Sequence, residues 1–482
     1  MFPKNTTSMS SMMNLKTELL PHQIPAVEKM IHTTIGGLFM DMGTGKSRTT
    51  IELVYRRTDK IDKAIWFCPV SLKETVRQEI LKHTDCTESD IYVFSNKTRD
   101  NKLPKTLWYV IGIESMSSST RMVLAANRLI TSKTMVILDE SSYIKGHDSK
   151  RTLRITALCR NARYRLILTG TPLSQGVVDL YAQMRFLSPK ILGYNSFYSF
   201  AANHLEYSEK FPGRIVRSHN TKYLAAKTKP YVYQITKEEC LDLPKKLYET
   251  RYFHMTDDQA HEYHLAKEEF LAEMNREDWN STTIFRLFTA LQSIVCGFWR
   301  RRVKGKFHLI EFRHHRIETF MEAVADIPES KKIIVWAKYQ YDIQHIVESL
   351  ADKYGGDSVT QFHGGIKEKN RPGQVDLFRS KARFFIATPS CGGHGLTLNE
   401  SHFVIFYNNG FKYSERLQAE DRDHRIGQDH DVTYIDIYCS GSIDDRINRA
   451  LSDKEDAATS FRQEVEKSQG DKGKLRELIK GL

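Results

Sequence analysis

Short runs of apolar residues recur along both halves of the chain, and segments with helical spacing of apolar residues lie between them. Runs of this kind are typical of buried parallel strands, and the intervening helical segments are the crossovers that parallel strands need. The pattern therefore predicts an α/β fold with a parallel sheet in each half. The runs are Ala64–Cys68, Trp108–Ile113, Met135–Leu138 and Arg165–Leu168 in the first half, and Lys332–Trp336, Phe384–Ala387, Phe403–Tyr407 and Val432–Ile437 in the second.

The middle of the chain has a different pattern. Between Thr256 and Val295 the apolar residues follow helical spacing, which predicts a helical insert between two α/β lobes. From about Asp453 the chain is rich in helix-forming residues and predicts a helical tail. The expected parts are a flexible N-terminus at 1–15, a first lobe at 16–255, the insert at 256–305, a second lobe at 306–455 and the tail at 456–482.

The composition is that of a globular chain with an excess of positive charge. Its 482 residues favour two or three folding units, since a domain usually has about 100–200 residues. Lys and Arg total 71 against 59 Asp and Glu, which gives a formal charge of +12. Such an excess either attracts polyanions or only keeps the protein in solution, and composition alone leaves both readings open.

The cysteines and the apolar stretches bear on the cellular setting. The seven cysteines include no CxxC pair, and no uninterrupted apolar stretch approaches about 18 residues. We therefore expect neither a zinc knuckle nor a disulfide framework, and no secretion or membrane span. We therefore expect a cytoplasmic protein. Nothing in the sequence demands more than a monomer.

A phosphate-binding loop is predicted at residues 40–47 (MDMGTGKS), between an apolar stretch and a helix-like segment. Glycines let backbone N–H groups face a phosphate, and the N-terminus of the next helix adds a favourable dipole. In this interpretation Lys46 pairs with the β- and γ-phosphates and the Ser47 hydroxyl ligates Mg²⁺. Met40 departs from the usual pattern, which begins with Gly or Ala. The expected nucleotide-binding residues are Gly43, Thr44, Gly45, Lys46 and Ser47.

An acidic pair follows one of the predicted strands. Asp139 and Glu140 come directly after Met135–Leu138, so both carboxylates would emerge at the carboxyl end of the strand, facing the phosphate loop. Asp139 would then hold Mg²⁺, and Glu140 would orient and deprotonate the attacking water. The alternative, a surface acidic pair after a strand, is common in general.

Three more residues of the first half are candidates for the nucleotide site. The side-chain amide of Gln23 offers both a donor and an acceptor, as adenine recognition needs. Thr169 and Thr171 follow the predicted strand Arg165–Leu168, and their hydroxyls would sense the γ-phosphate and relay its loss.

Two clusters of arginine stand out in the second half. Arg422 and Arg425, within residues 418–428 (QAEDRDHRIGQ), are three apart and would point the same way on a helical turn. Paired guanidinium groups can neutralise charge on a γ-phosphoryl group, an effect of about 10³–10⁵ in rate. A solvated helix face is the alternative for these arginines. The second cluster, at Arg300, Arg301, Arg302, Lys304 and Lys306, either touches a phosphate backbone or is a solvated surface.

The segment QAEDRDHRIGQ closely resembles the Swi/Snf-type ATPases of helicase superfamily two. Further segments agree in order between about Leu20 and Lys454: GKS at 45–47, DESSYIK at 139–145, LTGTPL at 168–173, DLYAQMRFLSP at 179–189, SCGGHGLTL at 390–398 and SIDDRI at 442–447. The resemblance implies two RecA-like lobes with parallel sheets, ATP hydrolysis in the cleft between them, and translocation along duplex DNA.

The resemblance also implies sequence-independent contacts with the DNA backbone. Small and hydroxylated residues at the matching loops suit close approach to phosphates rather than base reading. Each of these loops might instead be an ordinary turn at a strand end. The expected contacts are Ser71, Lys73, Ser115, Lys338, His363, Gly364 and Thr397, with Arg300, Arg301 and Arg302 added from the basic cluster, while Gly395 is expected at the nucleotide.

The sequence departs from the family pattern in two places. Ser142 stands where a histidine commonly links the nucleotide to Thr169 and Thr171, and His394 replaces an aliphatic residue. The chain lacks the long insertions of chromatin remodellers and resembles the compact versions of bacteria and phages. A phage-encoded version would work in the cytoplasm of the host.

The expected function is that of an ATPase, stimulated by DNA and dependent on ATP and Mg²⁺, that translocates along DNA and remodels branched or forked substrates. Duplex or branched DNA is the expected partner, and RNA is less suited. Two alternatives stay open: ATP-driven displacement of proteins or RNA polymerase from DNA, and a non-catalytic nucleic-acid clamp.

Overall fold

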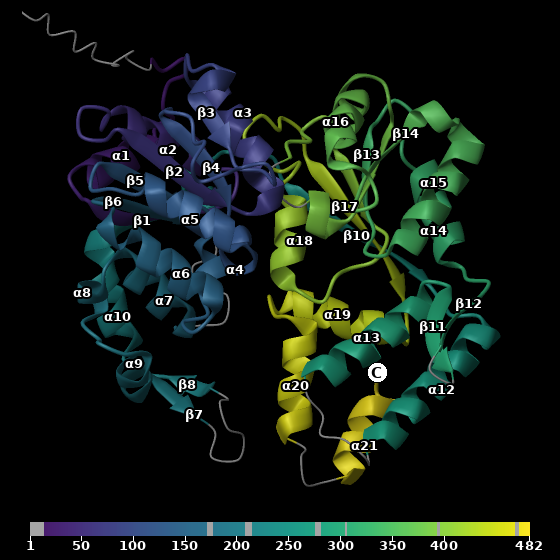
Figure 1. The fold of residues 1–482 in the computed structure, drawn as a ribbon. Helices are drawn as coiled ribbons and strands as arrows, with labels where there is room; N and C mark the ends of the chain where they lie inside the picture. The colour runs from purple at the N-terminus through teal and green to yellow at the C-terminus, as the bar shows by residue number, and fades with distance from the viewer. Residues whose placement is uncertain are drawn as a thin grey trace, which may run out of the picture. The chain divides into compact units, whose positions relative to one another are not determined.

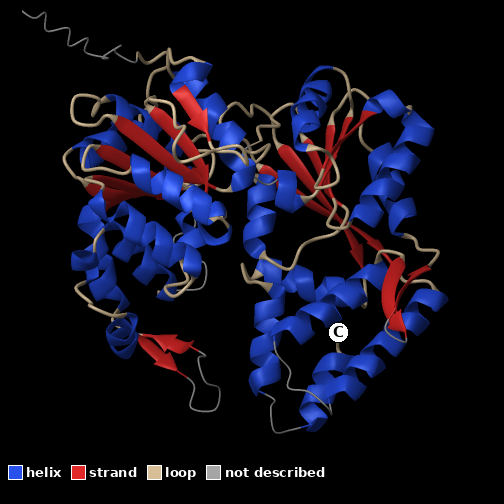
Figure 2. Ribbon diagram, viewed as in Figure 1, coloured by secondary structure: helices blue, strands red, loops and turns tan. Residues whose placement is uncertain are grey.

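The computed structural model describes residues 14–170, 177–207, 215–274, 281–303, 306–392, 396–467 and 472–482. The chain divides into two compact units, Met1–Asp242 and Leu243–Leu482. Each unit is built around one parallel sheet with helices on both faces, as the ribbons in Figures 1 and 2 show. The two-lobe α/β architecture expected from the apolar runs is therefore confirmed.

The first unit contains a seven-stranded sheet in the order β3-β4-β2-β5-β6-β1-β9, and every pairing in it is parallel. Because all strands run the same way, the loops that follow them gather at one edge of the sheet. The strands are β1 (Ile35–Met40), β2 (Lys63–Cys68), β3 (Ile91–Val93), β4 (Trp108–Gly112), β5 (Thr134–Leu138), β6 (Tyr164–Thr169) and β9 (Val232–Ile235).

Residues along each strand of this sheet alternate between two hydrophobic clusters. Ile65 and Phe67 of β2 pack on one face, while Ala64 and Trp66 pack on the other, as the two-residue period of a strand requires. The second face is covered by α1 (Gln23–Ile31), α2 (Lys46–Tyr55) and α3 (Lys73–His83). The first is covered by α4 (Ser115–Ser118), α5 (Thr120–Leu129), α6 (Lys150–Leu158), α7 (Val178–Leu187), α8 (Pro189–Leu192), α9 (Phe197–His204) and α10 (Thr221–Thr228).

The remaining elements of the first unit lie beyond the sheet. A small antiparallel hairpin follows α9, and a short helix follows β9. They are β7 (Leu205–Tyr207), β8 (Ile215–Ser218) and α11 (Lys237–Cys240).

The second unit contains a six-stranded parallel sheet in the order β10-β17-β16-β13-β15-β14. Ile333 and Val335 of β13 face one cluster and Ile334 and Trp336 face the other, so this sheet is also buried on both faces. The strands are β10 (Lys246–Phe253), β13 (Ile333–Trp336), β14 (Val359–Phe362), β15 (Phe384–Ala387), β16 (Phe403–Phe406) and β17 (Val432–Cys439).

The helical segment and the helical tail both join the core of the second unit. Phe270 and Leu291 from the middle of the chain share one hydrophobic cluster with Phe461 and Ile479 near its end. The helices of this cluster are α12 (Asp257–Met274), α13 (Ser281–Val295), α14 (Arg316–Ala325), α15 (Gln340–Tyr354), α19 (Ile443–Ser452), α20 (Ala457–Lys467) and α21 (Lys472–Lys480). The opposite face carries α16 (Arg371–Ser380) and α18 (Tyr413–Glu420), with α17 (Pro389–Gly392) after β15.

The division of the chain falls earlier than the sequence boundary at residue 255. Strand β10 pairs along its whole length with β17 and is the edge strand of the second sheet. Its sequence, KLYETRYF, mixes polar and apolar residues because an edge strand is only half buried, and it contains no apolar run.

Two further observations concern the whole of the described chain. All seven cysteines carry free thiols. Among the residues that the structure describes, no helix has both the length and the apolar character needed to cross a bilayer.

Candidate nucleotide site and nucleic-acid contacts

The glycine-rich loop connects the end of β1 to the start of α2. Gly43 and Gly45 have φ values of 79° and 85°, in the left-handed region that favours glycine. Gly45 caps α2, and a Cβ atom at this position would lie 2.0 Å from Nε2 of Gln23. The Thr44 side chain is buried, and its Oγ1 donates to the Asp41 carbonyl at 2.7 Å. The loop has the strand-to-helix setting that the sequence predicted for a phosphate-binding loop, with Ser47 in the first turn of α2.

Gln23 and His22 brace this loop from the start of α1. The Gln23 Nε2 donates to the carbonyls of Thr44 and Gly45 at 3.2 and 3.4 Å, and its Oε1 accepts from the backbone of Leu20. The His22 Nε2 donates to the Thr44 carbonyl at 2.7 Å. Both ends of the Gln23 amide therefore contact the protein itself, and sequence reasoning missed the part played by its neighbour His22.

Lys46 is the first residue of α2. Its Nζ donates to the carbonyl oxygens of Met40 and Asp41 at 2.7 and 3.1 Å. The ammonium group is thus held at the end of β1, beside the glycines.

The acidic pair follows β5 at the same edge of the sheet. Asp139 Oδ1 accepts from the backbone of Glu140 at 2.9 Å, and its Oδ2 accepts from Trp66 Nε1 at 3.3 Å. Burial, reinforced by the nearby charge of Glu140, raises the pKa of Asp139 to about 6, and Lys46 opposes this rise. A bound cation would stabilise the charged form of such a carboxylate, and carboxylate oxygens are the ligands that Mg²⁺ prefers.

Strand β6 lies between β5 and β1, so its end separates the acidic pair from the glycine-rich loop. Thr169 is the last residue of β6 and is buried. Gly170 follows it, and a Cβ atom there would lie 3.4 Å from the backbone nitrogen of Met42. Thr171 lies outside the described residues.

A connection from the acidic pair to α7 was not foreseen. Ser141 Oγ donates to Gln183 Oε1 at 2.6 Å, and Gln183 Nε2 donates to the Asp179 carbonyl at 3.0 Å. Ser141 therefore links the segment after Glu140 to α7, next to Ser142, where the family commonly has histidine.

Arg422 and Arg425 meet at one backbone atom in the second unit. The Nη1 atoms of the two side chains donate to the carbonyl oxygen of Leu396 at 3.3 and 3.1 Å. Helix α18 ends at Glu420, so both arginines lie in the turns that follow it rather than on a helix. The helical spacing argument therefore does not apply to them, although both side chains reach the same carbonyl oxygen. Gly395, the neighbour of Leu396, lies outside the described residues.

The residues around these arginines hold the segment 418–428 in place. Asp423 is buried and accepts from the Tyr434 hydroxyl at 3.1 Å, and burial raises the pKa of its carboxyl group. Glu420 contacts Arg416 and Lys246, at 2.7 and 2.8 Å. Most charged residues of this motif therefore contact neighbouring groups of the second unit and fix the position of the segment.

Seven of the expected DNA contacts lie in segments that follow the carboxyl ends of strands, whereas Arg300, Arg301 and Arg302 lie in strand β11. In the first unit, Ser71 and Lys73 follow β2 and Ser115 follows β4, at the edge that carries the glycine-rich loop. In the second unit, Lys338 follows β13, His363 and Gly364 follow β14, and Thr397 follows β15. Ser71 and Gly364 are exposed, and the Thr397 carbonyl accepts from Arg379.

The two lysines of this set are turned into the protein. Lys73 Nζ donates to the Phe94 carbonyl at 2.9 Å. Lys338 Nζ donates to Gln292 Oε1 at 2.8 Å and lies 3.1 Å from the centroid of the Phe411 ring. Burial lowers the pKa of Lys338 to about 7.

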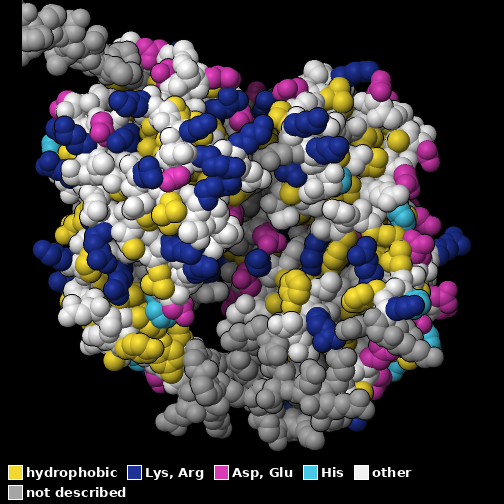
Figure 3. Space-filling view, in the orientation of Figure 1, with side chains coloured by type: hydrophobic (Ala, Val, Ile, Leu, Met, Phe, Trp, Pro, Cys, Tyr) yellow, Lys and Arg dark blue, Asp and Glu magenta, His cyan; other side chains and the backbone are white. Residues whose placement is uncertain are grey.

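Lys304 of the basic cluster lies outside the described residues. The other four residues lie in β11 (Phe298–Val303) and β12 (Lys306–Glu311), which pair as an antiparallel hairpin. Arg301 forms an ion pair with Glu269 of α12, whereas Arg300 is exposed. On the face drawn in Figure 3, Lys and Arg side chains are spread over both units, so this cluster is one part of a widely distributed positive charge.

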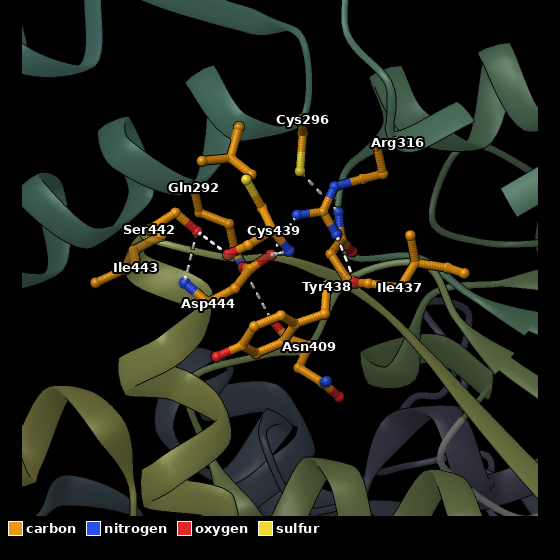
Figure 4. Close-up of polar contacts among 12 residues, drawn as sticks. Gln292, Cys296, Arg316, Asn409, Ile437, Tyr438, Cys439, Ser442, Ile443 and Asp444 are labelled. Carbon is orange, nitrogen blue, oxygen red and sulfur yellow. Dashed lines mark hydrogen bonds and ion pairs between the residues drawn. The ribbon is translucent and has the colours of Figure 1, made fainter. Parts of the chain in front are cut away.

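A buried ion pair inside the second unit was also missed. Arg316 of α14 is fully buried, and its Nη2 lies 2.5 Å from Asp444 Oδ2 at the start of α19. Its Nη1 donates to the carbonyl of Ile437 within β17 (Figure 4) and to the carbonyl of Tyr407, which follows the neighbouring strand β16. Ser442 caps α19 beside this pair, so the SIDDRI segment anchors α14 to the sheet.

Two family models match the chain. The SNF2-related domain matches residues 22–297, and the helicase conserved C-terminal domain matches residues 315–427. The first begins just before Gln23 and ends after α13. The second covers the segment from α14 to Gly427, including Arg422 and Arg425.

Curated relatives carry related names. An uncharacterized ATP-dependent helicase of Mycoplasma genitalium is 25% identical over 67% of this chain and 30% of its own length. A putative ATP-dependent helicase/translocase of Bacillus subtilis is 25% identical over 66% and 34%, and a human DNA annealing helicase and endonuclease is 23% identical over 95% and 42%. The chain thus spans less than half the length of each of these relatives.

Among solved structures, the Sulfolobus solfataricus SWI2/SNF2 ATPase core in complex with dsDNA aligns with a TM-score of 0.44. It is 23% identical and covers 97% of this chain and 98% of its own.

Proposed function

Because this chain belongs to the SNF2-related family of ATP hydrolases, as the match over residues 22–297 shows, we propose that it is a DNA-stimulated motor that translocates along duplex DNA and remodels branched or forked DNA. The observation that carries the proposal is the common edge of the first sheet. Lys46 lies beyond the end of β1, the pair Asp139–Glu140 follows β5, and Thr169 ends β6 between them, in the order that a nucleoside triphosphate site needs.

ATP is the proposed substrate of this edge. Backbone N–H groups at Gly43, Thr44 and Gly45 would face the phosphates, and Lys46 would exchange its two carbonyl partners for phosphate oxygens. Ser47 and Asp139 would hold Mg²⁺, which supplies charge neutralisation at the phosphates when it is bound.

The remaining residues would act on the nucleotide during turnover. Glu140 would orient the attacking water and take its proton. Arg422 and Arg425, which already converge on one carbonyl oxygen, would supply the guanidinium charge that a departing γ-phosphoryl group needs. Thr169, between the acidic pair and the loop, would respond to the loss of that group.

DNA is the proposed partner of the loops at the carboxyl ends of the strands. The net charge of +12 favours a polyanion, and the human relative named as a DNA annealing helicase supports a role in remodelling DNA. Ser71, Ser115, His363 and Gly364 suit backbone contacts, which carry no sequence preference. Lys73 and Lys338 would first have to leave their partners inside the protein.

Two measurements test the proposal. ATP turnover is compared without nucleic acid and with duplex DNA, single-stranded DNA or RNA, with Lys46→Ala as the inactive control. Duplex DNA should give the largest stimulation of ATP turnover. A turnover rate that is the same with and without nucleic acid would refute the proposal that the chain is a DNA-stimulated motor. A labelled four-way junction then tests branch migration, and a protein roadblock on linear duplex tests displacement. Displacement without junction processing would replace branched DNA by protein-bound DNA as the substrate.

A further inference from the structure

The β11–β12 hairpin has two unlike faces. Among the described residues its strands form a two-stranded sheet, and residues opposite one another in the register share a face. On the inner face, Trp299 is buried in the core of the second unit, opposite Ile310. Arg301 lies on this face too, paired with Glu269 and with its guanidinium carbon 5.0 Å from the centre of the Trp299 ring. The inner face therefore docks the hairpin on α12 (Figure 1).

The outer face carries one acidic residue, Glu311, opposite Phe298 at its base, and beyond it the face is apolar and basic and is exposed from Arg300 onward. At the base of the hairpin, Phe298 is buried against Tyr341, with ring centroids 4.4 Å apart. Beyond it, Arg300 lies opposite Leu309, which is 51% exposed. Phe307, nearer the turn, is 72% exposed. The hairpin thus presents a large aromatic ring and an aliphatic side chain to solvent beside a cation.

Exposed apolar groups of this size in a small hairpin indicate a binding surface rather than a core. The charge of the segment indicates the partner, because residues 300–306 include five Lys or Arg and no acid. Glu269 neutralises Arg301 on the inner face, while Arg300 points its charge outward. A polyanion that also offers flat apolar groups is a nucleic acid, whose phosphates take cations and whose bases stack on aromatic rings.

We propose that this outer face binds unpaired nucleotides, with Phe307 stacking on a base and Arg300 pairing with the adjacent phosphate. Bases in a duplex already cover one another's faces, so an aromatic ring gains most from a strand that is unpaired. The inference rests on the proposed function, since a fork or branch supplies unpaired nucleotides beside the duplex on which the motor moves.

The test measures binding of fluorescent oligothymidylate to the full chain by anisotropy. Phe307→Ala should weaken binding by about 5- to 150-fold, the contribution of one stacked base. Phe307→Trp should keep the affinity, and Phe307→Leu should lose it, because leucine is apolar but cannot stack. Arg300→Ala should flatten the dependence of log K on log salt by about 0.7, the value for one phosphate on a single strand. The matched control is Tyr198→Ala, which removes another aromatic side chain, 82% exposed on α9 of the first unit, and should leave binding unchanged.

Several outcomes would overturn the inference: full affinity in Phe307→Leu, equal loss in Tyr198→Ala, or an unchanged salt slope in Arg300→Ala. Affinity of the outer face for an acidic protein, but not for the oligonucleotide, would replace the proposed ligand by a protein. Thermal unfolding of each variant excludes misfolding as the cause. Duplex-stimulated ATP turnover of the unaltered chain tests the proposed function separately, so that each idea can fail alone.

Discussion

The Nζ atom of Lys46 lies 2.7 Å from the carbonyl oxygen of Met40, so the ammonium group donates a hydrogen bond to the strand that precedes its own loop. A second bond to the Asp41 carbonyl holds it there at 3.1 Å. Both of these carbonyl oxygens are neutral, and neutral oxygens bind a cation more weakly than charged oxygens do. These carbonyls therefore hold Lys46 at the loop, and a phosphate oxygen can take their place as the acceptor.

Lys46→Ala should lower ATP turnover by at least about 10²–10³-fold, because a donor aimed at the developing phosphate charge is lost. Lys46→Arg keeps the charge but not the compact geometry, and should recover only part of the rate. Steady-state phosphate release gives both rates. Turnover close to the unaltered level in Lys46→Ala would mean that residues 40–47 do not hold the reacting nucleotide.

The two arginines at Leu396 should behave differently on truncation. Arg425→Ala should retain nucleotide binding and lose about 10³-fold or more in turnover, the effect of an arginine finger. Arg422→Ala should also lower the free energy of unfolding by about 1–3 kcal/mol, because Arg422 is buried and holds the carbonyls of Gln418 and Leu396. A nucleotide titration, a turnover assay and urea unfolding separate the effects. Normal hydrolysis in Arg425→Ala would remove the finger assignment.

Asp444→Asn should destabilise the second unit by about 3–5 kcal/mol, because it leaves the fully buried Arg316 charge without its carboxylate. Glu400→Gln is the matched control: it breaks the pair with Arg379, which is largely exposed, and should cost less than about 1 kcal/mol. Chemical denaturation of both variants gives the comparison. Equal losses would show that the buried pair contributes no more than a surface one.

Lys338 should make stability depend on pH above neutrality. Its folded-state pKa is about 7, below the unfolded value of about 10.4, so between these values the unfolded chain binds more protons. The free energy of unfolding contributed by this group therefore rises as pH increases through that window. Lys338→Met should remove this increment, which urea unfolding of both proteins at several pH values would detect. Parallel pH profiles would place the Lys338 ammonium in water rather than against Gln292 and Phe411.

The apolar runs predict every interior strand except β1, which the sequence indicates only as the apolar stretch before the phosphate-binding loop, and they miss the edges. All eight apolar runs correspond to strands, namely β2, β4, β5 and β6 in the first sheet and β13, β15, β16 and β17 in the second. The strands without such a run include β3, β9, β10 and β14, which are the edges of the two sheets. An edge strand buries less apolar surface, so it carries a weaker pattern.

The same limit applies to the site. Residues that act within one short segment, such as Gly45 beside Lys46, can be identified from the motif because local geometry places them. The hydrogen bond from Trp66 to Asp139 joins residues 73 apart in the chain, and the ion pair between Arg316 and Asp444 joins residues 128 apart. Only the folded sheets bring the members of each pair together. The Arg301 ion pair with Glu269 is of this kind too, and it divides a basic cluster that looked uniform in the sequence.

The early position of the boundary between the units has a practical consequence. Strand β9 ends at Ile235 and β10 begins at Lys246, so every strand of each sheet lies on its own side of the peptide bond between Asp242 and Leu243. A gene split at that bond would yield two polypeptides, each holding the buried clusters that pack on its own sheet. Mixing the purified halves with and without ATP would then measure their affinity for each other directly as an association constant.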